Sequence, residues 1–434
     1  MKGFGDLYKS NIKSSKKTKP FKEQKINQAI QLHLKGNIPE AAKYYQQLIN
    51  KGCNDHRVFS NYGVILQGLG KLKEAQLSYQ KAIELNPNYA DAYSNLGNIL
   101  REFGKLQEAE IFTRKAIKLN SNYADAHLNL GNILLDLGKI KELILLSKST
   151  LLSDSINQGC KLFASLRITI AHLLLQNFPE TLININKTKN LINQGAIDFI
   201  KDEKNRKYAS TFYKFIISLY PLLEKDNKST DSKIPHFGES HCFSFAHQTL
   251  SISSQIKMIQ PVLISGGKAW HFANKKQNQW KDSFKRQIEN HTYSNQALIS
   301  FGEIDCRKDE GIINYILKNN KNIAEVCENT IKGYLDYMEE NLSPHYSQRY
   351  YFGVPAPTIK KELSDKLDIK RIKIIKQYNE SLKREVLSRG SYFLDVYALT
   401  SNNYGENNNL HMCDQFHLSP KCLSVLFKDH LYKT

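Results

Sequence analysis

A 34-residue repeat is the feature that most constrains how this 434-residue chain can fold. Three segments of the N-terminal part align without gaps and share glycines at two positions, which are Gly63, Gly97 and Gly131, and then Gly70, Gly104 and Gly138. The first glycine lets two helices approach closely, and the second ends a helix because glycine adopts a left-handed conformation at little cost. An earlier copy carries Gly36, Glu40 and Ala41 in the same phase. The spacing predicts a stack of helical hairpins, because one hairpin cannot bury its apolar face alone.

Small and aromatic residues complete each repeat. Ala75 and Ala109 keep the second helix close to the first, and Tyr79 fills the space between them. This pattern resembles the tetratricopeptide repeat (TPR) family. The resemblance implies an all-α TPR solenoid of about four repeats over residues 22–157, which binds a protein or peptide partner on its concave face. A purely structural spacer is the alternative interpretation.

The rest of the chain divides by composition. Residues 1–21 are rich in Lys and Ser and lack an apolar core, so we interpret them as a disordered basic tail and not as a secretory signal. The repeat pattern decays after Gly138, and residues 158–225 keep helical apolar spacing, which indicates a helical cap or connector. The segment Lys225–Lys233 is a polar linker.

Beyond the linker, short apolar runs alternate with helical patterns over residues 231–434. The strand candidates are Ile234–Phe237, Val262–Ile264, Ala297–Phe301, Tyr350–Val354 and Tyr392–Val396, and the main helical stretches are Gly311–Asn341 and Leu367–Ser388. Such alternation predicts a multidomain chain whose C-terminal part is an α/β domain with a parallel sheet. Loops at the carboxyl ends of such strands build the functional site.

Polar clusters stand at those strand ends. They are Gly238-Glu239-Ser240-His241 after the first strand, Ser265-Gly266-Gly267-Lys268-Ala269 after the second, and Gly302-Glu303-Ile304-Asp305-Cys306-Arg307 after the third. A fourth cluster near the C-terminus reads Asp414-Gln415-Phe416-His417-Leu418-Ser419-Pro420. All four are expected at one edge of the sheet.

This layout resembles the SGNH/GDSL hydrolase superfamily over residues 231–434. The resemblance implies a three-layer, flavodoxin-like α/β fold with Ser240 as nucleophile, His417 as general base and Asp414 as the carboxylate that orients His417. The backbone N–H groups of Ser240 and Gly267 would then hold the oxyanion. The chemistry agrees, because a serine hydroxyl needs an imidazole to take its proton and an anion to fix the imidazole tautomer. Gly238 permits the sharp turn that exposes the serine.

The sequence departs from the superfamily pattern at two positions. Glu239 stands where the family usually has Asp, and Ile304 stands where a Gly-x-Asn-Asp block supplies an Asn donor. The boxes also resemble a divergent bacterial subgroup, in which Gly302, Glu303, Asp305 and Arg307 would be characteristic site residues. The last three are equally compatible with a buried ion network.

Simpler interpretations stand beside each motif. Gly-x-Ser after a strand can be only a turn, and Asp-x-x-His can cap a helix. His241 either shapes the pocket or is a satisfied polar residue. Cysteines and histidines crowd the same boxes, but their spacing matches no standard zinc set, so no metal and no cofactor is predicted; the residues concerned are Cys242, Cys306, Cys413 and His411.

Charge and cysteine content limit the partners and the cellular compartment that we expect for the chain. The formal net charge is +19, but no basic helix or nucleic-acid motif concentrates it, so nucleic-acid binding is not expected. Seven scattered cysteines without a C-x-x-C pair indicate reduced thiols. No apolar run reaches the roughly 18 residues of a membrane-spanning helix, and a cytoplasmic location is the expectation.

Taken together, the motifs predict a serine esterase or O-acyltransferase that acts on an O-acyl ester, such as a carbohydrate ester. A TPR scaffold with a degenerate, non-catalytic hydrolase-like domain is the alternative.

Overall fold

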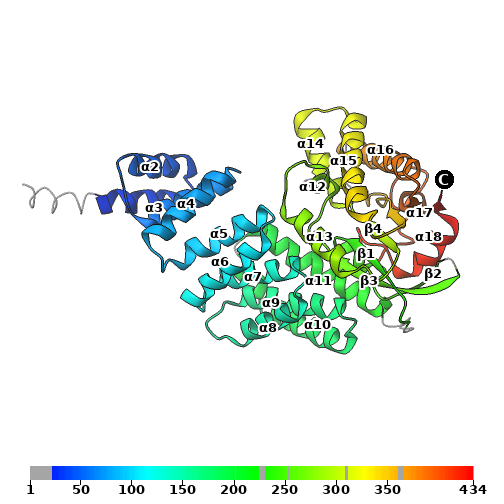
Figure 1. Ribbon diagram of the computed structural model, residues 1–434, viewed down its shortest axis with the longest axis horizontal. Helices are drawn as coiled ribbons and strands as arrows, with labels where there is room; N and C mark the ends of the chain where they lie inside the picture. Colours follow the sequence, from blue (N-terminus) through cyan, green and yellow to red (C-terminus); the bar gives the residue numbers. More distant parts are fainter. Residues whose placement is uncertain are drawn as a thin grey trace, which may run out of the picture. The chain divides into compact units, whose positions relative to one another are not determined.

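The computed structural model describes residues 22–200, 202–223, 230–252, 254–307, 311–359 and 366–433. The predicted basic tail at residues 1–21 and most of the predicted linker lie outside the described residues. Contacts divide the chain into two compact units, one of Met1–Glu102 with Gln107–Leu130 and the other of Phe103–Leu106 with Gly131–Thr434. The two units are described separately below, with the elements labelled as in Figure 1.

The predicted helical hairpins are confirmed. Residues 22–34 are helical, and the helices that follow are α2 (Ile38–Asn50), α3 (His56–Gly68), α4 (Leu72–Leu85), α5 (Ala90–Glu102), α6 (Leu106–Leu119), α7 (Ala124–Asp136) and α8 (Ile140–Leu152). Gly70, Gly104 and Gly138 end their helices with φ of 74°, 76° and 70°, the left-handed region that the sequence predicted for them.

The glycine in the first helix of each repeat is needed for close packing. A Cβ at Gly63 would lie 2.7 Å from Cε1 of Tyr79, the buried aromatic of the second helix. A Cβ at Gly97 would overlap Oγ1 of Thr113 and lie 3.2 Å from the carbonyl oxygen of Ala109. Both contacts join the two helices of one hairpin, so glycine sets the distance between them.

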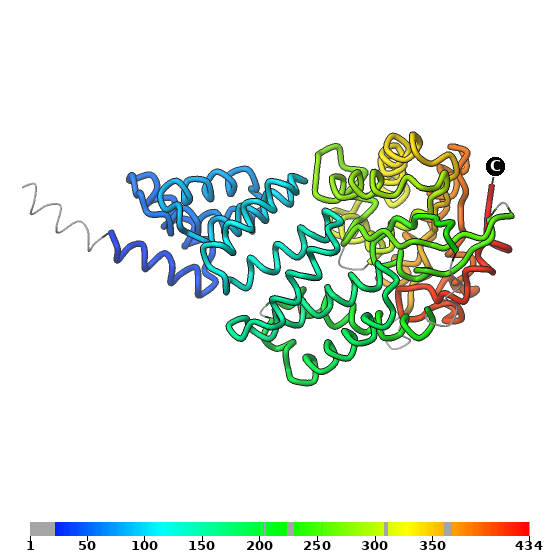
Figure 2. Tube along the Cα trace, turned by 60° about the horizontal axis from the view of Figure 1, so that its bottom comes forward, coloured from blue at the N-terminus to red at the C-terminus, as the bar shows by residue number. Residues whose placement is uncertain are grey.

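Three longer helices and a short 3-10 turn follow the hairpins. They are α9 (Gln158–Leu174), α10 (Phe178–Asn193), η1 (Ala196–Phe199) and α11 (Glu203–Leu223), which fits the predicted helical connector. Figure 2 shows their path in green. The connector is bound to the α/β domain by side chains of that domain: His247 Nε2 lies 2.6 Å from the carbonyl oxygen of Leu173, and Gln260 Nε2 donates to that of Leu174 at 3.0 Å.

A seven-stranded sheet forms the centre of the α/β domain. Its strands are β1 (Lys233–Gly238), β2 (Thr249–Ile252), β3 (Gln255–Leu263), β4 (Gln296–Ser300), β5 (Gln348–Phe352), β6 (Tyr392–Leu394) and β7 (Leu431–Tyr432). They lie in the order β2-β3-β1-β4-β5-β6-β7. The five central strands are parallel, as predicted, whereas β2 and β7 pair antiparallel at the two edges.

The predicted parallel sheet is therefore confirmed for its five central strands but not for its two edges. The sheet is mixed, because β2 forms an antiparallel hairpin with β3 and β7 returns along β6. Both edge strands are short, and β7 contains only two residues. Strands of this length leave no clear alternation in a sequence.

Helices cover both faces of the sheet. One face packs against α12 (Ala269–Ala273), α13 (Gln279–Asn290), α14 (Gly311–Asn319), α15 (Ile323–Leu342) and α16 (Lys366–Ser388). The other face packs against η3 (Ser240–Phe243) and its following turn, α17 (Val396–Thr400), η6 (Pro420–Cys422) and α18 (Leu423–Asp429). The parallel register explains this division: Phe237, Val262 and Ile299 are paired neighbours on one face, and Ile234, Ile259 and Leu298 belong to the other core.

Within the described ranges, no helix has both the length and the apolar character required to cross a lipid bilayer.

The packing at Gly97 predicts a measurable stability difference. Gly97→Ala is expected to lower the free energy of unfolding by about 1–3 kcal/mol, because the new methyl group overlaps Thr113. Gly68→Ala is the matched control, since Gly68 is also helical but faces open space; it should be neutral or stabilise by up to about 1 kcal/mol. Urea unfolding followed by circular dichroism measures both. Equal effects at the two positions would contradict the packing role.

Candidate active site

The polar clusters predicted at the strand ends lie on one edge of the sheet. β1 pairs in parallel with both β3 and β4, so the segments that follow these three strands emerge side by side. They are Glu239–His241 after β1, the turn leading to α12 after β3, and η4 (Ile304–Cys306) with its flanks after β4. The fourth cluster, Asp414–His417, lies in the loop before η6.

Three side chains from distant parts of the chain form a continuous hydrogen-bonded series. Ser240 Oγ lies 2.8 Å from Nε2 of His417. His417 Nδ1 lies 2.8 Å and 3.0 Å from the two carboxylate oxygens of Asp414. Ser240 is partly exposed, whereas His417 is buried. A nucleophile bonded to a base, with the base bonded to an orienting carboxylate, is the geometry that activates a serine.

The local sequence explains why Asp414 and His417 meet. Oδ1 of Asp414 accepts the backbone N–H groups of Phe416 at 2.7 Å and His417 at 2.8 Å, which folds the four residues into a tight turn. Burial would raise the pKa of Asp414, but the hydrogen bond from His417 and its other donors lower it. The carboxylate is therefore ionised at neutral pH and fixes the His417 tautomer with the proton on Nδ1.

His417 is a neutral imidazole in this setting. Burial lowers its pKa, against the opposing effect of the Asp414 hydrogen bond, and the nearby charge of His241 lowers it further. The two imidazole rings lie 4.6 Å apart. The Nδ1–H of His417 donates to Asp414, which leaves Nε2 without a proton and 2.8 Å from Oγ of Ser240. The single hydroxyl proton of Ser240 is donated to Glu239 in this structure, so it must turn to Nε2 before His417 can act as a general base.

His241 is charged, and its hydrogen bonds show why. Its Nδ1 contacts Oε1 of Glu239, and its Nε2 lies 2.9 Å from the carbonyl oxygen of Phe416. A carboxylate and a carbonyl only accept hydrogen bonds, so both ring nitrogens carry protons. Burial lowers the pKa of His241, but the Glu239 charge outweighs it and raises the pKa to about 9. This histidine is a counter-charge within the site.

Glu239 connects the ion pair to the serine. Its carboxylate accepts the backbone N–H of Ser240, and Oε2 lies 2.5 Å from Oγ of Ser240. Burial would raise the pKa of Glu239, but the charge and hydrogen bond of His241 hold it well below its ordinary value. The Ser240 N–H predicted for the oxyanion hole is thus directed at a carboxylate in this structure.

The block after β4 divides into an ion pair and an anchor. Arg307 bonds Glu303 through Nη2 at 2.6 Å and Nε at 2.8 Å, and its guanidinium lies 4.8 Å from the centre of the Phe416 ring. Asp305 is fully buried and accepts the N–H groups of Ala269 at 2.7 Å and Trp270 at 3.2 Å. These two hydrogen bonds connect the block after β4 to the turn after β3. Burial raises the pKa of Asp305 to about 7.

The predicted site glycines have packing roles in this structure. A Cβ at Gly238 would overlap Oγ of Ser300, and one at Gly302, where φ is 125°, would lie 2.6 Å from the hydroxyl of Tyr378. Gly267 packs against Ile264 and Phe301, and its N–H donates to the carbonyl oxygen of Ile264 at 2.9 Å. The second N–H predicted for the oxyanion hole is thus also bonded within the protein.

Glu239, His241 and Glu303 are buried, and their potential ligand atoms lie within 4.8 Å of one another, so the group has the geometry to hold a metal ion. The charges argue for a different role. His241 and Arg307 each bond one of the two carboxylates directly, so the cluster is balanced by the protein's own cations. Residues whose charges are already paired within the protein bind a divalent cation poorly.

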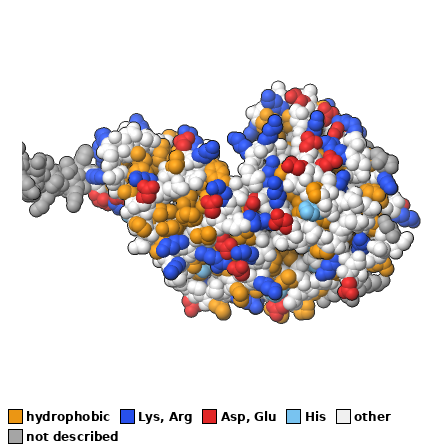
Figure 3. All heavy atoms as spheres, in the orientation of Figure 1, with side chains coloured by type: hydrophobic (Ala, Val, Ile, Leu, Met, Phe, Trp, Pro, Cys, Tyr) orange, Lys and Arg blue, Asp and Glu red, His pale blue; other side chains and the backbone are white. Residues whose placement is uncertain are grey.

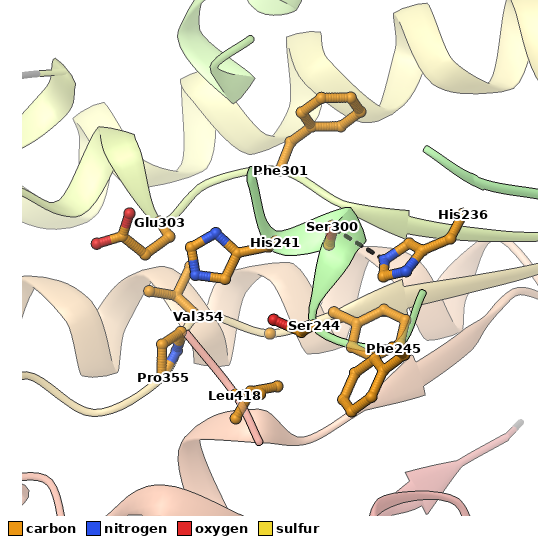
Figure 4. Close-up of a pocket in the computed structure, with 12 residues that line it drawn as sticks. His236, His241, Ser244, Phe245, Ser300, Phe301, Glu303, Val354, Pro355 and Leu418 are labelled. Atoms are coloured by element: carbon orange, nitrogen blue, oxygen red, sulfur yellow. Dashed lines mark hydrogen bonds between the residues drawn. The ribbon is translucent and has the colours of Figure 1, made fainter. Parts of the chain in front are cut away.

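A small cavity lies beside His241, lined in part by the segment after β5 (Figure 4). His241 and Glu303 border it on one side, and His236, bonded to Ser300 at 2.9 Å, borders it on the other. Phe352, Gly353, Val354 and Pro355 also line it. The remaining lining residues are Ser244, Phe245, Phe301 and Leu418.

Sequence reasoning missed one residue that touches the candidate triad. The ring of Phe215, on α11, stacks on the His417 imidazole with 3.7 Å between centroids and 20° between planes. Phe215 lies before the polar linker, in a segment whose apolar spacing indicated only a packed helix. No signal in the sequence distinguished it from the other core aromatics of that helix.

Family models match the repeat region. One described as a TPR repeat matches residues 63–104, and one described as a tetratricopeptide repeat matches residues 90–123. The N-terminal helices are tetratricopeptide repeats. No curated protein shows a significant match to the chain.

Several solved TPR proteins resemble the chain. MamA is 24% identical, with a TM-score of 0.35, and the match covers 39% of this chain and 96% of MamA. YrrB, described as a TPR protein with an unusual peptide-binding site, is 20% identical with a TM-score of 0.34, covering 43% and 90%. A thermophilic TPR protein of Thermus thermophilus, TTC0263, is 17% identical with a TM-score of 0.34, covering 44% and 98%.

The buried pair of His241 and Glu239 predicts a pH-dependent stability. The pKa of His241 is raised above its ordinary 6.5 to about 9 in the folded protein. Its stabilising contribution is therefore complete below about pH 6.5 and is lost as pH rises through 9. At pH 6, His241→Gln should lower the free energy of unfolding by about 3–5 kcal/mol, because it leaves the Glu239 carboxylate buried without its counter-charge.

Urea unfolding at several pH values measures this effect. The difference between wild type and His241→Gln should shrink from pH 6.5 to pH 9. The double variant Glu239→Gln/His241→Gln is the control, since it removes both charges and should recover part of the lost stability. A difference that stays constant over this pH range would show that His241 is not charged in the folded protein.

Proposed function

We propose that the C-terminal α/β domain is a serine ester hydrolase or O-acyltransferase of the SGNH type, acting on an O-acyl ester such as a carbohydrate ester. The observation that carries this proposal is the hydrogen-bonded series from Ser240 through His417 to Asp414. The lowered pKa values of Asp414 and His417 support an ionised carboxylate and a neutral imidazole, and the Ser240 hydroxyl has to exchange its hydrogen bond to Glu239 for one to His417.

The proposed reaction uses these three side chains in two steps. Ser240 Oγ attacks the ester carbonyl, and its proton passes to Nε2 of His417, whose Nδ1–H remains bonded to Asp414. The bond to the leaving alcohol breaks, the alcohol oxygen takes the proton from His417, and the acyl group stays on Ser240. Water or an acceptor hydroxyl, deprotonated by His417, then releases the acyl group as an acid or a new ester.

The topology supports the proposed fold family. The five parallel strands lie in the order β3-β1-β4-β5-β6, which is second, first, third, fourth and fifth along this part of the chain. This is the doubly wound, flavodoxin-like order, in which ligands bind beyond the carboxyl ends of the strands where the order reverses. β1 lies at that reversal, and Ser240 follows it directly.

A non-catalytic scaffold is the second candidate, and specific contacts favour it. The N–H of Ser240 bonds Glu239 and the N–H of Gly267 bonds Ile264, so neither is open to an oxyanion in this arrangement. Ile304 offers no side-chain donor. Catalysis therefore requires that substrate binding release these groups. Each working oxyanion donor lowers the barrier by about 2.7–4 kcal/mol, so their loss would leave little activity.

TPR repeats are typical of protein-interaction scaffolds, and we propose that the repeat unit binds a protein or peptide partner. Hydrophobic side chains gather on this part of the surface in Figure 3. Leu77 and Ile111, which are 34 residues apart and occupy equivalent places on α4 and α6, are each 67% exposed. Exposed apolar side chains repeated at one position provide contact area for a partner.

Labelling with a fluorophosphonate probe tests the proposed nucleophile. The wild-type chain should be labelled covalently, and Ser240→Ala should lose labelling and lower ester turnover by about 10⁴-fold or more, because the attacking oxygen is gone. Intact-mass spectrometry and hydrolysis of a chromogenic acetate ester measure the two effects.

The matched control is Ser251→Ala, which removes an exposed hydroxyl from the edge strand β2 and should leave both readouts unchanged. A folded wild-type chain that neither labels nor turns over any ester would reject the enzyme and favour the scaffold. Labelling that persists in Ser240→Ala would place the nucleophile elsewhere.

A further inference from the structure

Helix α11 belongs to the helical connector, yet it contacts the candidate triad. Its Phe215 is fully buried and lies parallel to the imidazole of His417, with 3.7 Å between centroids. The face of the imidazole is therefore covered by an aromatic ring that comes from a segment about 200 residues earlier in the chain.

The same helix contacts two neighbouring parts of the site. Phe212, almost one turn before Phe215, packs edge-to-face on Phe243 at 6.4 Å, and Phe243 ends the turn η3 that begins with Ser240. Ser218, whose hydroxyl donates to the carbonyl oxygen of Phe215, lies near the thiol of Cys413, the residue before Asp414. α11 thus touches His417 directly and the chain next to both of its partners.

Hydrogen bonds alone leave the imidazole incompletely fixed. The torsion that turns a histidine ring about its Cβ–Cγ bond has broad minima, so the ring can rock while Nδ1 keeps its bond to Asp414. A rock of the ring moves Nε2 out of line with the Ser240 hydroxyl. A stacked ring at van der Waals distance resists this motion and also keeps water from that face.

We propose that Phe215 is a positioning residue, through which helix α11 holds the His417 imidazole in line with Ser240 and keeps it dehydrated. This inference rests on the proposed ester-processing function. It makes the helical connector part of the site, so that the α/β domain from residue 231 onward lacks one wall of its own candidate active site.

The charged groups around His417 determine how its pKa should change when Phe215 is replaced. His417 is faced by Asp414, by the His241 imidazolium and by Glu239, while α11 presents the apolar ring of Phe215. Burial is the largest cause that lowers the pKa of His417. Removing the covering ring admits water without changing any of these charges, so the pKa should rise towards its ordinary value.

The experiment compares full-length Phe215→Leu with wild type. The NMR titration of the His417 ring, assigned with His417→Gln, should move to higher pH in Phe215→Leu. The fluorophosphonate labelling rate should fall by about 10- to 100-fold, and the acidic limb of its pH profile, where His417 loses its second proton, should move to higher pH with the His417 pKa. Phe215→Tyr keeps a ring over the imidazole and should restore both readouts.

Tyr213→Leu is the matched control, because it removes an aromatic ring from the same helix on the face that packs on Leu162 and Ala196, away from His417, and it should leave the His417 titration unchanged. An unchanged His417 titration in folded Phe215→Leu would overturn the proposal. If Phe215→Leu does not fold, Phe215→Met serves in its place, because the flexible methionine side chain adapts to an irregular space in a core. The His417 titration tests the positioning role even if the wild-type chain is not labelled. Absent labelling of wild type would reject the proposed enzyme, and an unchanged titration in Phe215→Leu would reject the positioning role, so the two failures can be told apart.

Discussion

The candidate site depends on the parallel pairing of β1 with strands on both of its sides. β1 bonds β3 along its whole length and β4 over its last three residues, so the three strands end at nearly the same level. This register places Glu239 and Ser240 between the turn that precedes α12 and the block around Asp305. Asp305 can then bond the N–H groups of Ala269 and Trp270, which it reaches only because β3 and β4 flank β1. A shift of one residue in either pairing would turn these side chains to the opposite face.

Two histidines in one small site have opposite protonation states, and their partners explain the difference. His241 lies between a carboxylate and a carbonyl oxygen, both acceptors, so it keeps two protons. His417 lies between a carboxylate and the Ser240 hydroxyl, so the proton on Nδ1 is enough once that hydroxyl donates to Nε2 in place of Glu239. The charge of His241 also disfavours a second charge on His417 nearby. The charge of His241 thus supports a neutral His417, whereas the charge of Glu239 opposes it by raising the pKa of His417. Glu239 also accepts the N–H of Ser240, which is the proposed oxyanion donor.

The sequence predicted what depends on local spacing. The 34-residue period required the hairpins, since Gly63 and Gly97 have no room for a side chain. Polar clusters after apolar runs predicted which loops gather at the sheet edge, and the three-residue spacing of Asp414 and His417 matched the turn that joins them. The edge strands were missed because their pairing comes from tertiary contact and not from their own alternation. The hydrogen bond from the Gly267 N–H to the carbonyl oxygen of Ile264 could not be predicted either, because the sequence of side chains does not show where a backbone N–H donates.

Phe215 shows why a boundary drawn from composition need not be a boundary of the site. The polar stretch at 225–233 separates two patterns of hydrophobicity, and that separation is real in the sequence. Apolar surfaces pack together wherever they lie in the sequence, and a polar linker between them does not prevent this. Helix α11 therefore covers the faces of Phe243 and His417 that the α/β domain leaves uncovered. A catalytic histidine that must be shielded from water and held in one orientation needs a side chain packed against its exposed face. In this chain that side chain belongs to the helical connector. A change in the packing of α11 would therefore alter the hydration and orientation of His417 without changing any residue of the α/β domain.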